Sequence, residues 1–362
     1  MRADTFDEFR AARYWPQLDG LRVVSIAVVL VAHTGDKWFP SFKGALGVVI
    51  FFVISGYLIT SLLLREEHRN GRVSLKGFYV RRVFRIVPLY LVALACAGVL
   101  LFAGLGGSPD SFVERLPYLL TFNADFAVYG TFVHAWSIGV EEKFYILWPL
   151  IAFAILPLAS RRAWIAVGLL AACVTSAFVP ALSYFGTYTA ILMGCLLAIL
   201  MHDQRAFEVI RRMATPVVST VLVALAVVMF AVDWYLPWTD STGFAHPLFA
   251  LAVTLTFPGL IVGQSWFRAI LSNRVIAFIG TRTYGIYLFH VFAIDAVNKV
   301  IPDGQTDPLL GLIRLLASAL LSYAIAEVLY RILERPMIAV GRRLTRNTLP
   351  ERRVPADRDS VR

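Results

Sequence analysis

The chain has 362 residues, of which 58% are hydrophobic and 16% are charged, and its mean hydropathy is +0.69. This composition holds too few polar residues to cover a surface that faces water on every side, so a soluble globular protein is excluded. The formal net charge is +10, and we attribute it to contact with anionic lipid headgroups, not to nucleic acid. We therefore predict an all-α polytopic integral membrane protein.

Apolar segments close to the length of about 20 residues that a helix needs to cross a bilayer recur along the chain. We predict a bundle of about ten transmembrane helices, at 21–35, 44–64, 84–104, 142–158, 163–181, 184–201, 216–235, 246–263, 275–297 and 309–332. The segment before the first span is too polar for a cleaved signal peptide. The three cysteines lie in apolar spans without paired spacing, which predicts neither a disulfide nor a metal site.

Basic residues are distributed unevenly between the loops. If the N-terminus is inside, 28 of the 34 Lys and Arg residues lie on one side of the membrane. The positive-inside rule then places both termini in the cytoplasm. We divide the chain into a cytoplasmic segment (1–17), a membrane domain (18–340) and a basic, disordered cytoplasmic tail (341–362).

The first span carries two polar residues, Arg22 and His33. They are eleven positions apart, so on a helix they share a face and lie about 16 Å apart along the axis. Charged side chains that face lipid are costly, which indicates that the protein interior uses both. Their separation matches the reach of an extended cofactor arm.

Arg82 and Arg85, at the cytoplasmic end of the third span, are three positions apart and share a helix face. Two guanidinium groups placed together favour bidentate capture of a phosphate. The alternative is that they are ordinary membrane anchors. That is our interpretation of Arg65, Arg69 and Arg72 in the same region.

Two adjacent carboxylates, Glu141 and Glu142, lie at the start of the predicted fourth span, where the chain enters the membrane from outside. Because successive helical residues are turned by about 100°, we expect only one of them to face the bundle interior. It could serve as an ion-pair partner or as a catalytic or substrate-binding acid. In the ninth span His290 is open to two interpretations, a packing residue or a ligand.

Six motifs occur along the chain in a characteristic order. They are LDGLR (18–22) followed by His33, FFVISGYLI (51–59), RRVFRIVP (81–88), WSIGVEEKFY (136–145), YGIYLFH (284–290) and ERP (334–336). In this set and order the chain resembles the membrane-bound acyltransferase 3 family over nearly its whole length. It departs from the family pattern at Gly139 and Lys143, where Ser and Gln are usual, and at Phe289, where Trp is common.

The resemblance implies an O-acyltransferase of the inner (plasma) membrane. Such an enzyme transfers an acyl group, most often acetyl, from cytoplasmic acyl-coenzyme A to a hydroxyl of a sugar in a cell-surface polysaccharide, glycolipid or glycosylated product. The implied partners are therefore acyl-CoA as donor substrate, a carbohydrate-containing acceptor and membrane lipids. No permanently bound cofactor and no metal is expected. Residues 18–340 would form the acyltransferase domain.

We assign roles to the motif residues on this basis. Arg22, Arg82 and Arg85 would hold the phosphates of coenzyme A, and His33 would act as general base, with Glu141 as the second catalytic residue. A covalent acyl-histidine step is the rival mechanism. The residues assigned to substrate binding are Ser55, Tyr57, Trp136, Glu142 and His290, with Ser55 or Tyr57 as donors to the developing oxyanion.

Two other functions remain open. Polar residues within spans also line the pathways of transporters and flippases, although we find no paired Gly/Pro-broken helices in corresponding halves. A purely structural membrane protein is disfavoured by the number of charges within spans. Because the sequence ends soon after the ERP motif, we expect no fused extracytoplasmic hydrolase-like domain. The acyl group would go directly to the acceptor or to a separate extracytoplasmic partner.

Overall fold

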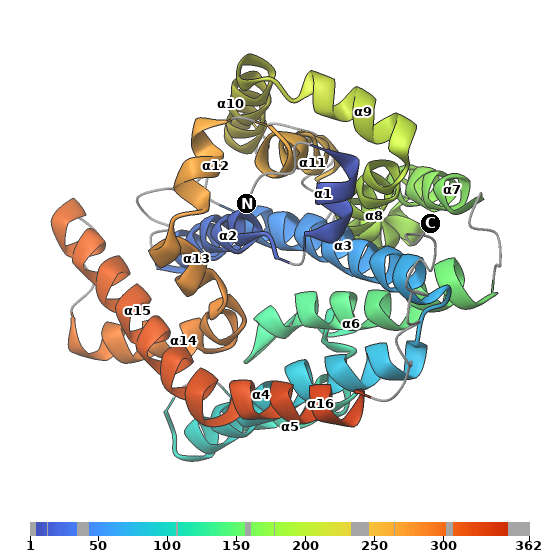
Figure 1. Ribbon diagram of the computed structural model, residues 1–362. Coiled ribbons are helices and arrows are strands. Elements are labelled where there is room, and N and C mark those ends of the chain that lie inside the picture. Colours follow the sequence, from blue (N-terminus) through green and yellow to red (C-terminus); the bar gives the residue numbers. More distant parts are fainter. Residues whose placement is uncertain are drawn as a thin grey trace, which may run out of the picture.

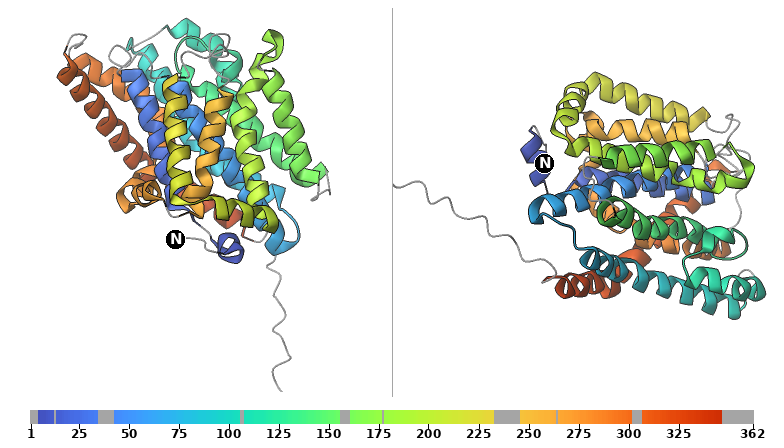
Figure 2. Two further views of the ribbon diagram at one scale, coloured as in Figure 1. Left: turned by 90° about the horizontal axis from the view of Figure 1, so that it is seen from above. Right: turned by 90° about the vertical axis from the view of Figure 1, so that its right-hand side faces the viewer.

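The computed structural model describes residues 5–12, 14–34, 43–105, 108–155, 161–176, 178–232, 246–263, 265–301 and 307–346. All regular elements in these ranges are helical, which confirms the predicted all-α class. Most of the long helices run side by side as a bundle (Figures 1 and 2).

The helices follow the chain in a simple order. They are α1 (Phe6–Ala11), α2 (Pro16–Thr34), α3 (Gly44–Asn70), α4 (Leu75–Phe102), α5 (Pro109–Leu120), α6 (Trp136–Pro149), α7 (Arg162–Ser176), α8 (Thr189–His202), α9 (Gln204–Met213), α10 (Pro216–Val232), α11 (Pro247–Ile261), α12 (Trp266–Leu271), α13 (Arg274–Gly280), α14 (Thr283–Val300), α15 (Pro308–Leu329) and α16 (Arg335–Leu344). A 3₁₀ segment, Pro180–Tyr188, leads into α8, and π-helical segments follow α6 (Leu150–Ile155) and α15 (Tyr330–Glu334).

Five helices of the described part are long and apolar enough to cross a membrane, and seven if each sharply bent pair forms one span. Two shorter apolar helices, α7 and α11, add to these. Each of the ten predicted ranges contains a helix, although four of them include residues outside the described ones, namely 35, 156–158, 177 and 233–235. A multi-pass membrane protein is thus supported, while the count of about ten spans stays a prediction.

The predicted ninth span, 275–297, is not one straight helix. It is divided into α13 and α14, which are bent by 71°. Arg282 lies at the break, and its guanidinium bonds to the carboxylate of Glu327 on α15 at 2.7 Å. The ion pair satisfies a charge that would be costly if it were buried without a partner.

The two ends of the membrane domain also differ from our division of the chain. At the N-terminal end, α2 already begins at Pro16, inside the segment predicted to precede the domain. At the C-terminal end, α16 continues to Leu344, so residues 341–344 are helical and not part of a disordered tail. The rest of the predicted tail, 347–362, lies outside the described residues.

Helix α3 forms the centre of the bundle, with α2 and α8 packed against it (Figure 1). In its most apolar window, 78% of the residues are buried. Close packing depends on two glycines: a Cβ atom on Gly56 would lie 1.9 Å from the carbonyl oxygen of Ile191, and one on Gly194 would lie 2.3 Å from that of Val53. Small residues at such crossings are typical of membrane helix packing. They set the position of α3, which carries Ser55 on its other face.

Candidate active site

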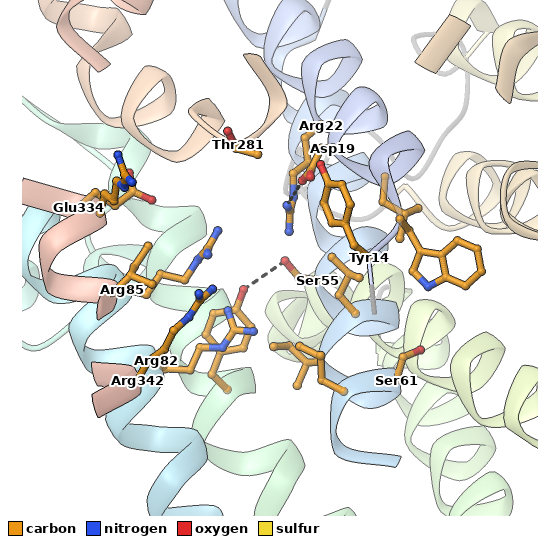
Figure 3. A pocket seen from close by; sticks show the side chains of 18 of the residues that line it. Tyr14, Asp19, Arg22, Ser55, Ser61, Arg82, Arg85, Thr281, Glu334 and Arg342 are labelled. Carbon is orange, nitrogen blue, oxygen red and sulfur yellow. Dashed lines mark hydrogen bonds and ion pairs between the residues drawn. The ribbon is translucent and has the colours of Figure 1, made fainter. Parts of the chain in front are cut away.

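A basic cavity of about 670 Å³ lies between α2, α3, α4 and α16. Its basic lining residues are Arg22, Arg65, Arg82, Arg85, Arg335 and Arg342, and its acidic lining residues are Asp19 and Glu334. Figure 3 shows Arg22 on one side and Arg82, Arg85 and Arg342 on the other, around a shared space. The excess of positive charge suits an anionic ligand.

Arg82 and Arg85 have guanidinium groups that are not in direct contact with a carboxylate, although Glu142 and Glu334 lie close enough to act on them electrostatically. Within the described residues neither forms a hydrogen bond or an ion pair, whereas the neighbouring Arg81 pairs with Glu66 at 3.1 Å. The Arg82 guanidinium lies over the ring of Tyr145, 5.0 Å from its centroid, and over that of Phe78 at 5.6 Å. This stacking orients Arg82 while leaving its N–H groups available to a ligand.

Arg22 belongs to the same cavity but is held differently. Its Nη1 bonds to the carboxylate of Asp19, one helical turn earlier, at 2.5 Å. Tyr14, just before α2, also lines the cavity, and desolvation followed by a hydrogen bond to Asp19 raises its pKa to about 12. Tyr14 therefore stays a neutral hydroxyl donor at physiological pH.

Arg65 corrects one of our predictions, because it is not an ordinary anchor. It is buried, lines the basic cavity, and donates hydrogen bonds to the carbonyl oxygens of Ala12 at 2.5 Å and Phe9 at 3.3 Å. It thus ties the N-terminal segment to α3. Arg72 is exposed, as an anchor should be.

A smaller cavity, which we call the inner chamber, has a volume of about 90 Å³. It shares Arg22, Ser55, Arg82, Arg85, Tyr145 and Thr281 with the basic cavity, so the two are contiguous. Its far end is lined by Ser137 and Tyr287, whose hydroxyl oxygens are 2.7 Å apart. The inner chamber therefore extends the basic cavity towards α6 and α14.

Both carboxylates of α6 line the inner chamber, which corrects the expectation that only one would face the interior. Glu141 accepts a hydrogen bond from the Ser55 hydroxyl at 2.5 Å, and the Tyr145 hydroxyl donates to Ser55 at 3.2 Å. Glu142 Oε1 is buried without a partner in the described structure. Because helices surround α6 on more than one side, residues 100° apart on it can both be interior.

The His33 ring lies near the other end of α2 from Arg22. Its Nδ1 is 2.8 Å from the carbonyl oxygen of Val29, and its ring centroid is 4.9 Å from that of His290. A carbonyl oxygen only accepts hydrogen bonds, so Nδ1 carries the proton and Nε2 keeps a lone pair. His33 lines neither the basic cavity nor the inner chamber. The structure thus brings His33 together with His290, and Arg22 with Arg82 and Arg85.

The other predicted binding residues fall into two groups. Ser55 and Glu142 line the inner chamber. Tyr57 does not, which corrects its assignment: it is fully buried, and its hydroxyl contacts the sulfur of Met201 at 3.7 Å because its side of α3 packs against α8. Trp136 lies behind the chamber wall, with its ring 6.0 Å from that of Phe52.

Sequence reasoning missed His134, although it begins the segment that carries the two glutamates. His134 is 4% exposed, and its ring centroid is 5.1 Å from that of His290. With His33 these rings form what we call the histidine cluster. The sequence feature that could have revealed it is the presence of a histidine next to an apolar span. Taken alone, such a histidine is more often a packing residue than a functional one.

The departures Gly139 and Lys143 are structurally linked. Lys143 forms an ion pair with Asp125 at 2.7 Å and donates to the carbonyl oxygen of Phe122 at 3.0 Å. A Cβ on Gly139 would lie 2.6 Å from the same Asp125 carboxylate. The ion pair therefore occupies the space that a side chain at position 139 needs.

This arrangement predicts that Gly139→Ser is destabilising and that Lys143→Gln reduces the penalty. We expect Gly139→Ser alone to cost about 1–3 kcal/mol, since it overpacks a closed site. In the double variant Asp125 can move, so the two effects should not be additive. Thermal unfolding of the four proteins in detergent would test this, and strictly additive costs would contradict it.

The fold and the cavities define a multi-pass helical membrane protein with a basic cavity that continues into an inner chamber. Residues 15–330 match the family model described as "Acyltransferase domain", so the chain belongs to this family. This confirms the family to which the motifs pointed.

Similar named proteins include two from Staphylococcus aureus. The chain is 29% identical over 365 residues to "Putative O-acetyltransferase SAS0844" of strain MSSA476, covering 93% of this chain and 59% of that protein. It is 28% identical over 373 residues to O-acetyltransferase OatA of strain NCTC 8325 / PS 47, covering 92% and 59% respectively. The chain thus spans about three fifths of the length of these relatives. No solved structure matches it.

Proposed function

We propose that this protein is an O-acyltransferase that moves an acyl group from acyl-CoA to a hydroxyl of a carbohydrate-containing acceptor. The observation that carries the proposal is the pair of guanidinium groups without a direct hydrogen bond or ion pair in the described structure, Arg82 and Arg85, in a cavity that continues into a chamber lined by Ser55 and Glu141. Membership of the acyltransferase family and the names of the relatives support acyl transfer, with acetyl as the group.

The donor binds through its phosphates at the basic cavity. Arg82 and Arg85 supply N–H donors that the described protein leaves unused, and Arg22 and Arg342 add positive charge. The pantetheine arm then passes the shared lining residue Ser55 into the inner chamber. Its thioester is thereby directed towards Ser137 and Tyr287, beyond which the histidine cluster lies.

His33 acts as general base. Its Nδ1–H is committed to the Val29 carbonyl, and its Nε2 can accept the proton of the acceptor hydroxyl as that oxygen attacks the thioester carbon. Ser55 donates its hydroxyl hydrogen to Glu141 and accepts one from Tyr145, and these two bonds fix the position of the Glu141 carboxylate in the chamber. The C–S bond breaks, the ester C–O bond forms, and the coenzyme A thiolate takes up one proton.

The proposal includes the topology. We place both termini and the basic cavity at the cytoplasmic face of the plasma membrane, with about ten spans, because most Lys and Arg residues then face inside. The acceptor is a sugar of a surface polysaccharide, glycolipid or glycosylated product. It receives the acyl group directly or through a separate extracytoplasmic partner.

Radiolabelled acetyl-CoA tests the function. Purified protein in membranes that contain the host's own glycans should release coenzyme A thiol and move the label to a glycan. Protein that binds acetyl-CoA and yet releases no thiol and transfers no label would contradict acyl transfer. Movement of an unmodified glycan across vesicles would support a flippase instead.

A further inference from the structure

Helix α16 forms one wall of the basic cavity, in a part that does not border the inner chamber and that we call the cavity mouth. The residues of α16 that line it are Arg335, Ile338, Ala339 and Arg342. Their spacing of i, i+3, i+4 and i+7 places them on a single face of the helix. Both arginines are exposed, and among the described residues neither side chain forms a hydrogen bond or an ion pair. The face thus presents two unused cations to the cavity mouth.

The next residue, Arg343, shows that contact with the cavity is not common to all basic residues of α16. Arg343 is exposed as well, but it lines neither the basic cavity nor the inner chamber. Attraction to anionic lipid headgroups requires positive charge near the membrane surface and no particular cavity. Lipid anchoring therefore explains Arg343 but does not explain why Arg342 lines the cavity.

A close contact between two helices fixes the position of Arg342. Helix α16 packs against α4 at Gly341, where a Cβ atom would lie only 2.9 Å from the Cβ atom of Phe84. Phe84 stands between Arg82 and Arg85 in the sequence, and both of these arginines line the cavity. Because Gly341 has no side chain, Arg342 enters the cavity on the side where Figure 3 shows Arg82 and Arg85.

The proposed donor carries phosphate at two places. A diphosphate joins the pantetheine arm to the adenosine, and a separate phosphate monoester, with a charge of about −1.5 to −2, stands on the 3′ oxygen of the ribose. If the arm enters the inner chamber, the diphosphate lies beside Arg82 and Arg85, which line both cavities. The 3′-phosphate is farther from the arm, so it lies nearer the cavity mouth, where α16 supplies the positive charge.

We propose that Arg342 binds the 3′-phosphate of coenzyme A, while Arg82 and Arg85 hold the diphosphate. This inference rests on the proposed function, because it takes acyl-CoA as the donor. Arg342 donates charge-assisted hydrogen bonds to the phosphate oxygens, and Arg335 adds to the positive potential at the cavity mouth. Helix α16 therefore recognises the end of the donor that is remote from the thioester, and it favours coenzyme A over a thioester that lacks the 3′-phosphate.

Titration calorimetry with coenzyme A and with dephospho-coenzyme A tests the assignment in the detergent-solubilised full chain. We expect Arg342→Ala to weaken the binding of coenzyme A by about 10-fold, the loss of a charge-assisted hydrogen bond, and to leave the affinity for dephospho-coenzyme A unchanged. Arg342→Glu should weaken the binding of coenzyme A further, because a carboxylate repels the phosphate. Arg343→Ala is the matched control on the same helix and should bind both ligands as wild type does.

Several results would overturn the assignment. An equal loss of affinity for both ligands in Arg342→Ala, or no loss for either, would exclude Arg342 from the 3′-phosphate. If Arg82→Ala or Arg85→Ala alone removed the preference for coenzyme A, the 3′-phosphate would belong to α4. Lipid phosphates are the other source of this chemistry. Arg342-dependent enrichment of phosphatidylglycerol over phosphatidylcholine around the extracted protein, with unchanged coenzyme A affinity, would assign Arg342 to lipid headgroups.

The same preparations separate this inference from the proposed function. Protein that shows the Arg342-dependent preference for coenzyme A and yet transfers no acetyl from acetyl-CoA would support the phosphate site and overturn acyl transfer. Wild-type protein that binds neither coenzyme A nor dephospho-coenzyme A would overturn both. Acetyl transfer with a raised KM for acetyl-CoA and an unchanged kcat in Arg342→Ala would support both, because the 3′-phosphate lies far from the reacting carbon.

Discussion

Replacing His33 with alanine is expected to lower acetyl transfer by about 10²–10⁴-fold, the usual contribution of a positioned general base. Coenzyme A should bind to the variant as it does to wild type, because His33 lines neither the basic cavity nor the inner chamber. The measurement is label transfer from radiolabelled acetyl-CoA to membrane glycans, together with coenzyme A titration of the same preparations. A folded His33→Ala protein that transfers label at the wild-type rate would rule out His33 as the base.

The matched control is His68→Ala. His68 is an exposed histidine near the C-terminal end of α3 and lines neither cavity, so its removal should change nothing. The rival acyl-histidine mechanism predicts a different result for wild type: protein quenched in the absence of acceptor would retain label that is absent from His33→Ala. Direct transfer predicts no retained label in either protein.

Replacing Arg82 with alanine is expected to weaken coenzyme A binding by about 10–100-fold, the loss of a charge-assisted hydrogen bond worth about 1.5–3 kcal/mol. Arg82→Lys should recover only part of the affinity, because an ammonium group cannot bind a phosphate in two places or stack as guanidinium does on Tyr145. Titration calorimetry of the detergent-solubilised protein with coenzyme A measures both effects.

Arg72→Ala controls for net charge, since Arg72 is exposed in the turn before α4 and lines neither cavity. Its affinity for coenzyme A should equal that of wild type. Dephospho-coenzyme A, which lacks the 3′-phosphate, shows whether Arg82 or Arg85 binds that phosphate. The alanine variant of the arginine that binds the 3′-phosphate should lose less affinity for dephospho-coenzyme A than it loses for coenzyme A. Unchanged binding of coenzyme A to Arg82→Ala would exclude the basic cavity as the donor site.

Arg22 and His33 show where prediction from periodicity ends. Their spacing predicts a common helix face, and each does face other polar residues of the bundle. However, the spacing of two residues on one helix does not predict which residues of other helices they contact. Arg22 meets Asp19 and the arginines of α4, while His33 meets His290. Apart from Asp19, which lies on the same helix, these partners come from other helices, distant in the chain.

The residues on α3 and α6 make the same point. Ser55 and Tyr57 are two positions apart, and either could be an oxyanion donor on sequence grounds. Packing against α8 buries Tyr57 against Met201, whereas Ser55 opens to the chamber. Glu142 is turned away from Glu141 on α6 but also reaches the chamber. Which face of a helix is interior depends on how many neighbours surround it.

The sequence alone determined that the protein is helical and membrane-embedded, and its ordered motifs pointed to the family, because hydropathy and short motifs are local properties of the chain. Only the tertiary structure decided that Arg82 and Arg85 share a cavity with Arg22, and that His134 joins His33 and His290. These groups of residues form because the helices cross at close contacts. At Gly56 on α3 and Gly194 on α8, for example, the two backbones meet without side chains between them. Helix crossings fix the positions of distant side chains, and no local pattern encodes them.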